Sequence, residues 1–174
     1  IDRPDVSQYR LAAHLGLAFL IYTLLIFIGW SLFQNNSVSP VQSKSKQNYL
    51  FKHFIFSYLL LFTTIISGAF VAGTKSGLIY NSFPLMGTNL YPDDIFTLTP
   101  FWLNFFENMS TIQFNHRVLA TITCGFILYT AFKELRRQPA GYYKTILKLL
   151  LFFIVLQYLV GITAVINAVP FVIG

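Results

Sequence analysis

Charged side chains are scarce in this sequence: they make up 10% of its 174 residues, and only six of them are Asp or Glu. Soluble domains carry about 25% charged residues, so this composition excludes an ordinary soluble globular domain. In their place the chain is 55% hydrophobic and 18% aromatic. These proportions predict an integral membrane protein.

Cysteine and the common catalytic motifs are also sparse. Cys124 is the single cysteine and lies inside an apolar run, so we interpret it as a small buried hydrophobe that forms no intramolecular disulfide. The sequence contains no HExxH, no phosphate-binding glycine loop and no Ser-His-Asp spacing. It therefore lacks the motifs of the common metalloproteases, nucleotide-binding proteins and serine hydrolases.

The net charge of +6 does not have the pattern of a nucleic-acid-binding protein. Such proteins carry a basic helical face or alternate basic and aromatic residues, and this sequence does neither. Its lysines and arginines gather instead in short segments between apolar runs, as in membrane proteins. We expect membrane lipid, and no nucleic acid, as a partner.

Long apolar runs are the dominant feature of the chain. At about 1.5 Å per helical residue, each is long enough to cross a hydrocarbon core of about 30 Å. The predicted spans are residues 11–33, 54–73, 111–132 and 145–165. The expected fold is an all-α integral membrane domain of four transmembrane helices over residues 1–174. Because the sequence begins at Ile1 and ends just after an apolar run, we expect it to be part of a longer protein.

The connecting segments predict the orientation of the chain. Lysines and arginines far outnumber acidic residues in segments 34–53 and 133–144, and the positive-inside rule assigns these two inner loops to the cytoplasm or matrix. Segment 34–53 is rich in Asn, Ser and Gln and is expected to be a disordered loop. The segment 74–110 then forms the outer loop, which we expect to be ordered against the bundle.

Two histidines stand beside arginines at the openings of predicted spans. Arg10 and His14 are four residues apart and so lie on one helical face, and His116 precedes Arg117 directly. Charged or titratable side chains at bilayer depth cost roughly 2.5 to 3.5 kcal/mol each on insertion scales, so they usually mark a ligand, a proton path or a cofactor. The orientation puts both histidines at the outer end of the membrane.

Haem is the cofactor that this chemistry suggests. A neutral imidazole binds haem iron, and an arginine nearer the water pairs with haem propionates. One shared site and two separate sites are both compatible with the spacing. The alternative is that the histidines are interfacial hydrogen-bonding anchors and that the arginines extend to lipid headgroups.

Other polar groups have simpler interpretations. His53 is expected at the loop boundary of the second span, and Asp93 with Asp94 beside Pro92 is typical of a turn more than of a metal site. Small residues in segment 67–73 permit close approach of a helix or a flat macrocycle, and helix packing is the simpler explanation.

Four motifs together closely resemble haem A synthase of the cytochrome oxidase assembly pathway. They are YRLAAHL at 9–15, GAFVAG at 68–73, GLIYNSFPLM at 77–86 and QFNHR at 113–117. The resemblance covers nearly the whole chain except the inner loops. It implies eight spans in two four-helix halves, of which this chain is similar to spans four to seven.

The resemblance also implies roles for the site residues. His14 matches the last histidine of the first-half pair, where the substrate haem O is oxidised, and His116 matches the first histidine of the second-half pair, which holds a haem b cofactor. Arg10 and Arg117 would pair with propionates. The other histidine of each pair, and the family's first outer loop with its catalytic carboxylate, would lie outside these residues.

The activity implied by the resemblance is oxidation of the C8 methyl group of haem O to the formyl group of haem A. Haem O synthase and cytochrome oxidase assembly factors would be partners, in a bacterial cell membrane or the mitochondrial inner membrane. The main alternative is a non-catalytic membrane anchor subunit that holds a bis-histidine haem in a respiratory complex. A transporter fragment would instead carry discontinuous helices and polar residues at the midplane.

Overall fold

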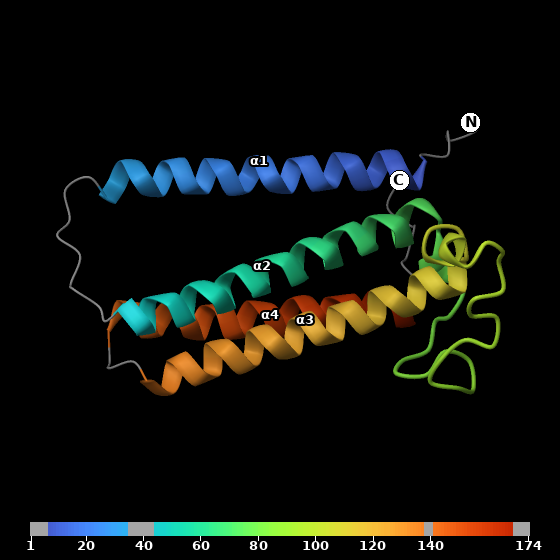
Figure 1. The fold of residues 1–174 in the computed structure, drawn as a ribbon. Helices are drawn as coiled ribbons and strands as arrows, with labels where there is room; N and C mark the ends of the chain where they lie inside the picture. Colours follow the sequence, from blue (N-terminus) through green and yellow to red (C-terminus); the bar gives the residue numbers. More distant parts are fainter. Residues whose placement is uncertain (1–6, 35–43, 138–140, 169–174) are drawn as a thin grey trace.

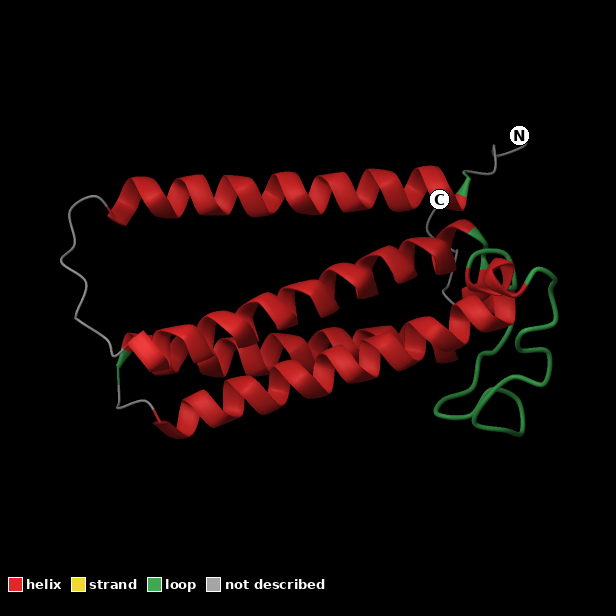
Figure 2. Ribbon diagram, viewed as in Figure 1, coloured by secondary structure: helices red, strands yellow, loops and turns green. Residues whose placement is uncertain are grey.

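The chain is a bundle of long helices that run side by side (Figure 1). The computed structural model describes residues 7–34, 44–137 and 141–168, and these ranges contain helices and loops but no strand (Figure 2). The long helices are α1 Gln8–Gln34, α2 Lys44–Gly73, α3 Met109–Arg137 and α4 Tyr142–Ile166. All four are long and apolar enough to cross a membrane, which confirms the predicted all-α, four-span architecture.

The helices extend beyond the apolar runs that predicted them. α2 begins at Lys44, so residues 44–53 are helical and not the disordered loop that we expected, whereas residues 35–43 of that loop lie outside the described ranges. The basic end of α3 likewise continues to Arg137. Helical hydrogen bonds are made within the backbone, and Lys and Gln are good helix formers, so a helix does not stop where its side chains become polar.

Small residues bring α1 and α2 close together. A Cβ atom on Gly73 would lie 2.5 Å from the Cα atom of Gln8, so only glycine fits this crossing. Ala12 of α1 and Ala69 of α2 are both buried. The small residues of segment 67–73 therefore serve helix packing in part, as small residues commonly do between membrane helices.

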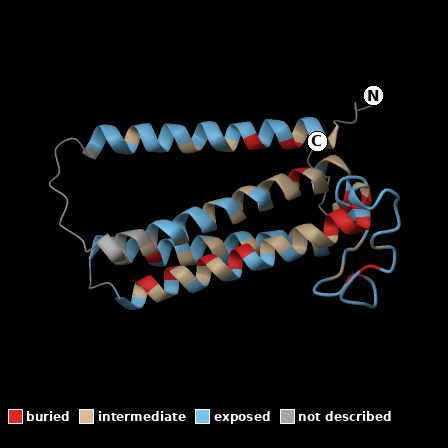
Figure 3. Cartoon of the chain, in the orientation of Figure 1, coloured by how far each residue is buried: buried red, intermediate tan, exposed pale blue. Residues whose placement is uncertain are grey.

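Hydroxyl groups join the remaining helices. Thr64 of α2 and Thr123 of α3 share a hydrogen bond of 2.7 Å, and Thr121 of α3 shares one of 2.8 Å with Tyr158 of α4. Most of α1 and α4 is exposed, and buried residues gather along α3 and at its outer end (Figure 3). Since the exposed faces of α1 and α4 are rich in Leu, Ile and Phe, they are suited to lipid or to further helices.

The outer segment between α2 and α3 folds over one end of the bundle (Figure 1). It contains only two short helices, η1 Ser76–Leu78 and η2 Phe101–Phe105. Asn104 is fully buried and hydrogen-bonds both the backbone N–H and the carbonyl of Leu98. Asn108 caps α3 by accepting a hydrogen bond of 3.0 Å from the backbone N–H of Thr111. The prediction that segment 74–110 is ordered against the bundle is confirmed, and its position on the outer side of the membrane stays a prediction.

Glu107 ties this outer segment to the start of α1. Its carboxylate accepts a hydrogen bond of 3.2 Å from Nε2 of Gln8 and another from the hydroxyl of Tyr9. Because Glu107 lies just before α3, the first turns of α1 and α3 are held at the same end of the bundle. That end carries both His14 and His116.

Candidate functional site

His116 lies on α3 with its ring turned toward α2. A Cβ atom on Gly68 of α2 would lie 3.1 Å from Cε1 of the His116 ring, a contact so tight that the ring would have to shift. Glycine at this position therefore makes room for the imidazole. The Nδ1 atom of His116 is buried and has no hydrogen-bond partner in the described structure.

A cavity of about 200 Å³ adjoins the His116 ring between α2, α3 and α4. Its lining is mainly apolar, with a few polar groups among which are Arg117, Gln157 and Tyr158. An apolar cavity with a few convergent polar groups is the usual form of a cofactor site. Phe83 of the outer segment also lines the cavity, so this segment forms part of its wall.

Arg117 holds the outer segment over this cavity. Its guanidinium donates hydrogen bonds to three backbone carbonyls, at 2.7 Å to Tyr80, 2.8 Å to Ser82 and 3.3 Å to Leu85. Each bond has a charged donor, which makes it stronger than a neutral one. The structure therefore shows Arg117 as an organiser of the outer segment, a role that the sequence pattern did not suggest.

Gln113, one turn before Arg117, binds the same segment. Its side chain is only 2% exposed, and Nε2 donates to the carbonyls of Tyr80 at 3.0 Å and Gly77 at 3.4 Å. Gln113 and Arg117 thus converge on the Tyr80 carbonyl. The only sequence signal for Gln113 was its place in the QFNHR motif, and that motif did not indicate a role for the glutamine.

The acidic pair of the outer segment makes local hydrogen bonds. Asp94 accepts hydrogen bonds from the hydroxyls of Ser110 at 2.7 Å and Tyr80 at 3.3 Å, and Asp93 accepts one of 2.8 Å from Asn89. Burial, and then the charge of Asp94, raise the pKa of the Tyr80 phenol, which keeps it protonated as a donor. No cluster of three or more metal-ligating side chains occurs among the described residues.

His14 and Arg10 are exposed on α1 and do not meet His116 in the described structure. Ala12 and Gly16, by contrast, are buried against α2. At about 100° per helical residue, His14 points about 200° away from Ala12, and Arg10 lies on the same outward face. The structure therefore favours two separate sites over one shared site.

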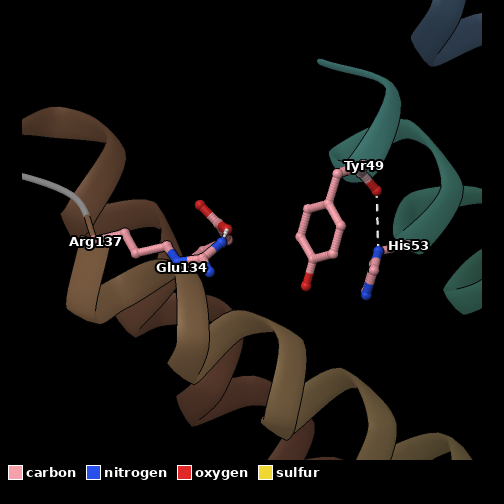
Figure 4. A network of polar contacts seen from close by, with 4 residues as sticks. All are labelled: Tyr49, His53, Glu134 and Arg137. Carbon is pink, nitrogen blue, oxygen red and sulfur yellow. Dashed lines mark hydrogen bonds and ion pairs between the residues drawn. The ribbon is translucent and has the colours of Figure 1, made fainter. Parts of the chain in front are cut away.

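His53 lies at the opposite end of the bundle, well inside α2 and not at a loop boundary. Its Nδ1 atom bonds the Tyr49 carbonyl of its own helix at 2.9 Å, and Arg137 pairs with Glu134 at 3.2 Å on α3 nearby (Figure 4). These contacts are local to each helix. The His53 ring also stacks on Phe126 of α3, with 6.1 Å between the ring centroids, and His53 is a useful comparison for the two other histidines.

The residues around His116 fit a haem. A neutral imidazole ligates iron through one ring nitrogen while the other carries a proton, and the unpartnered Nδ1 atom leaves the ring free to take this form. The adjoining cavity is mainly apolar, as a porphyrin face requires. Gly68 has no Cβ atom and so leaves room for the imidazole ring of His116. His14 offers the same ligand type on an open helix face.

Comparison with known proteins agrees with this chemistry. The family model described as cytochrome oxidase assembly protein matches residues 1–174. A protein named heme A synthase from Nitrosospira multiformis is 38% identical over 174 residues, which cover 98% of this chain and 47% of that relative. A heme A synthase of Wolbachia pipientis wMel is 36% identical over 175 residues, covering 100% of this chain and 47% of the relative.

A human relative is similar over a shorter region. The human protein named heme A synthase COX15 is 44% identical over 130 residues, which cover 74% of this chain and 31% of the human protein. The chain thus spans about half the length, or less, of the curated relatives it matches. No solved structure matches it.

Proposed function

Because this chain belongs to the family of cytochrome oxidase assembly proteins, we propose that it takes part in haem A synthesis, by oxidation of the C8 methyl group of haem O to a formyl group. The observation that carries this proposal is the His116 site. There a histidine with an unpartnered buried nitrogen adjoins an apolar cavity, at the same end of the bundle as Arg10 and His14. Its helices are proposed to be part of an eight-helix, two-half bundle.

We assign the haem b cofactor to His116. When bound, haem iron supplies the redox chemistry, and the protein contributes axial ligation, orientation and an apolar surrounding. His116 would provide one axial nitrogen, while Gly68 and the cavity wall would keep its ring in place. Arg117 would act mainly by holding the outer segment over the cavity, because its two terminal nitrogens, Nη1 and Nη2, already donate to three backbone carbonyls. Pairing of Arg117 with a propionate stays a prediction.

We assign the substrate haem O to the outward face of α1. His14 would support the substrate iron there, and Arg10, one turn nearer the end of the helix, would pair with a propionate. This face is exposed in the described structure, so a helix that completes the site can approach it without displacing α2. Haem O synthase and oxidase assembly factors are the partners that this activity would need.

Conversion of haem O tests the proposed activity directly. Membranes that contain the full-length protein, supplied with haem O, are expected to form haem A, measured by chromatography of extracted haems. Membranes without the protein are the control. A non-catalytic anchor subunit would bind haem and leave haem O unchanged, so the same measurement separates the two functions.

The proposed location is a bacterial cell membrane or the mitochondrial inner membrane, with the basic ends of α2 and α3 facing the cytoplasm or matrix. A membrane-impermeant thiol reagent is expected to label Asp93→Cys in intact cells but Arg137→Cys only after permeabilisation. Both positions are exposed, and the native Cys124 is buried, so background labelling should be low. Labelling at position 137 but not at 93 in intact cells would reverse the orientation.

Gly68→Val should displace the His116 ring, because even a single Cβ atom there is 3.1 Å from Cε1. Overpacking of this kind costs about 1–3 kcal/mol, so the affinity of the protein for b-type haem should fall by about 5- to 150-fold. Gly125→Val is the matched control, since a Cβ atom there has nothing within 4 Å. Equal haem affinity in the two variants would show that the Gly68 contact does not matter.

A further inference from the structure

Three buried polar atoms without hydrogen-bond partners lie within one turn of α3. They are Oε1 of Gln113, Nδ1 of His116 and Nε of Arg117, and they are the only such side-chain atoms among the described residues. A buried polar group that makes no hydrogen bond destabilises the folded state, so such a group usually has a partner. Gln113 lies three residues before His116 and four before Arg117, so its side chain is a neighbour of both on the helix surface.

The orientation of the Gln113 amide follows from its own contacts. The Nε2 atom donates to the carbonyls of Gly77 and Tyr80, and a carbonyl can only accept a hydrogen bond. An inverted amide would point Oε1 at these two oxygens. The Oε1 atom is therefore a buried acceptor, and it makes no hydrogen bond in the described structure.

The three atoms complement one another. Oε1 of Gln113 accepts, Nε of Arg117 donates, and Nδ1 of His116 donates when the ring carries its proton there. A single water that accepts from the two N–H groups and donates to Oε1 satisfies all three, and buried waters typically make about three hydrogen bonds to such groups. The structure contains no direct bond between these side chains, so a bridging molecule is the connection that fits.

We infer that Gln113 is a positioning residue for His116, which it holds through a water-bridged network shared with Arg117. The network fixes the proton on Nδ1 and leaves Nε2 of His116 as the nitrogen that can bind iron. Partners of this kind orient a metal-binding histidine and make it a stronger electron donor. This inference rests on the proposed haem site at His116.

The reduction potential of the haem in the full-length protein is the measurement that tests this role. In Gln113→Leu the hydrogen-bond acceptor Oε1 is lost. The His116 ring then donates less electron density to the iron, and the ferric state of the haem is less favoured. Loss of such a partner commonly weakens a metal site by about 10- to 100-fold. A tenfold loss confined to ferric haem raises the one-electron potential by about 59 mV.

Two further variants distinguish the two roles of Gln113, which are positioning of His116 through Oε1 and support of the outer segment through Nε2. Gln113→Glu loses the same Nε2 donors as the leucine variant but keeps an acceptor, so its potential should stay at or below that of the unmodified protein. Asn108→Ala weakens the outer segment elsewhere and should leave the potential unchanged. If the leucine variant loses its haem while the glutamate variant keeps it, the inference is also supported.

The failures of the two proposals are distinguishable. A haem signal that is present and depends on His116, together with equal potentials or equal haem loss in the Gln113→Leu and Gln113→Glu variants, overturns the positioning role alone. A full-length protein with no haem bound through His116 overturns the haem site and the inference together.

Discussion

Replacing His116 by alanine in the full-length protein is expected to remove the b-type haem absorption of the purified protein. His116 is the one histidine among the residues that line the described cavity, and its Nδ1 atom has no hydrogen-bond partner there. Loss of a mere outer-shell partner weakens metal sites by about 10- to 100-fold, so loss of the ligand itself should exceed 100-fold. Haem content per protein, measured from the pyridine haemochrome spectrum, gives the result.

His53→Ala is the matched control for this experiment. It removes the same side chain from the other end of the bundle, where His53 bonds a carbonyl of its own helix and lines no described cavity. The control should retain its haem. An unchanged b-type spectrum in His116→Ala would contradict the assignment and return His116 to the interpretation of an interfacial anchor.

His14→Ala is expected to stop formation of haem A while the b-type haem at His116 remains. The substrate iron would lose its axial support, whereas the cavity between α2, α3 and α4 has no contribution from this face of α1. The ratio of haem A to haem O in cells, together with the b-type spectrum of the purified protein, measures both effects at once. Simultaneous loss of both signals would argue against two separate sites.

Arg10→Ala provides a graded comparison on the same helix face. A charge-assisted hydrogen bond contributes about 1.5–3 kcal/mol, so its loss should weaken haem O binding by about 10- to 150-fold without removing the ligand. Haem A formation by Arg10→Ala should therefore recover when the concentration of haem O is raised, whereas haem A formation by His14→Ala should not. Normal haem A in both variants would leave His14 and Arg10 as interfacial residues only.

The membrane architecture was predictable because it depends on one-dimensional information. A run of apolar residues long enough to cross the bilayer has few alternatives to a helix, since lipid offers the backbone no hydrogen bonds. The placement of the starts of α1 and α3 at the same end of the bundle followed from the same count of spans. The N-terminal extension of α2 to Lys44 could not be predicted in this way. A polar segment can form either a helix or a loop, and its hydropathy does not distinguish the two.

The candidate site was predictable only in part. His14 and His116 could be selected because titratable groups are unusual at the ends of apolar runs. The roles of Gly68 and Gln113 could not be selected in this way, because they depend on which atoms of α2 and the outer segment lie opposite them. Arg117 shows the same limit: the sequence pattern indicated a charged partner for a ligand, whereas the structure shows three carbonyls around its guanidinium.

The carboxylate of Glu107 has a consequence for the depth of the two histidines. It accepts hydrogen bonds from Gln8 and Tyr9 of α1 and lies just before the start of α3. It therefore fixes the position along the bundle axis of the helix that carries His14 relative to the helix that carries His116. Sliding α1 by one turn, about 5.4 Å, would break both bonds. If haem binds at both histidines as proposed, the difference in depth between the two haems would be set by a contact outside either binding site.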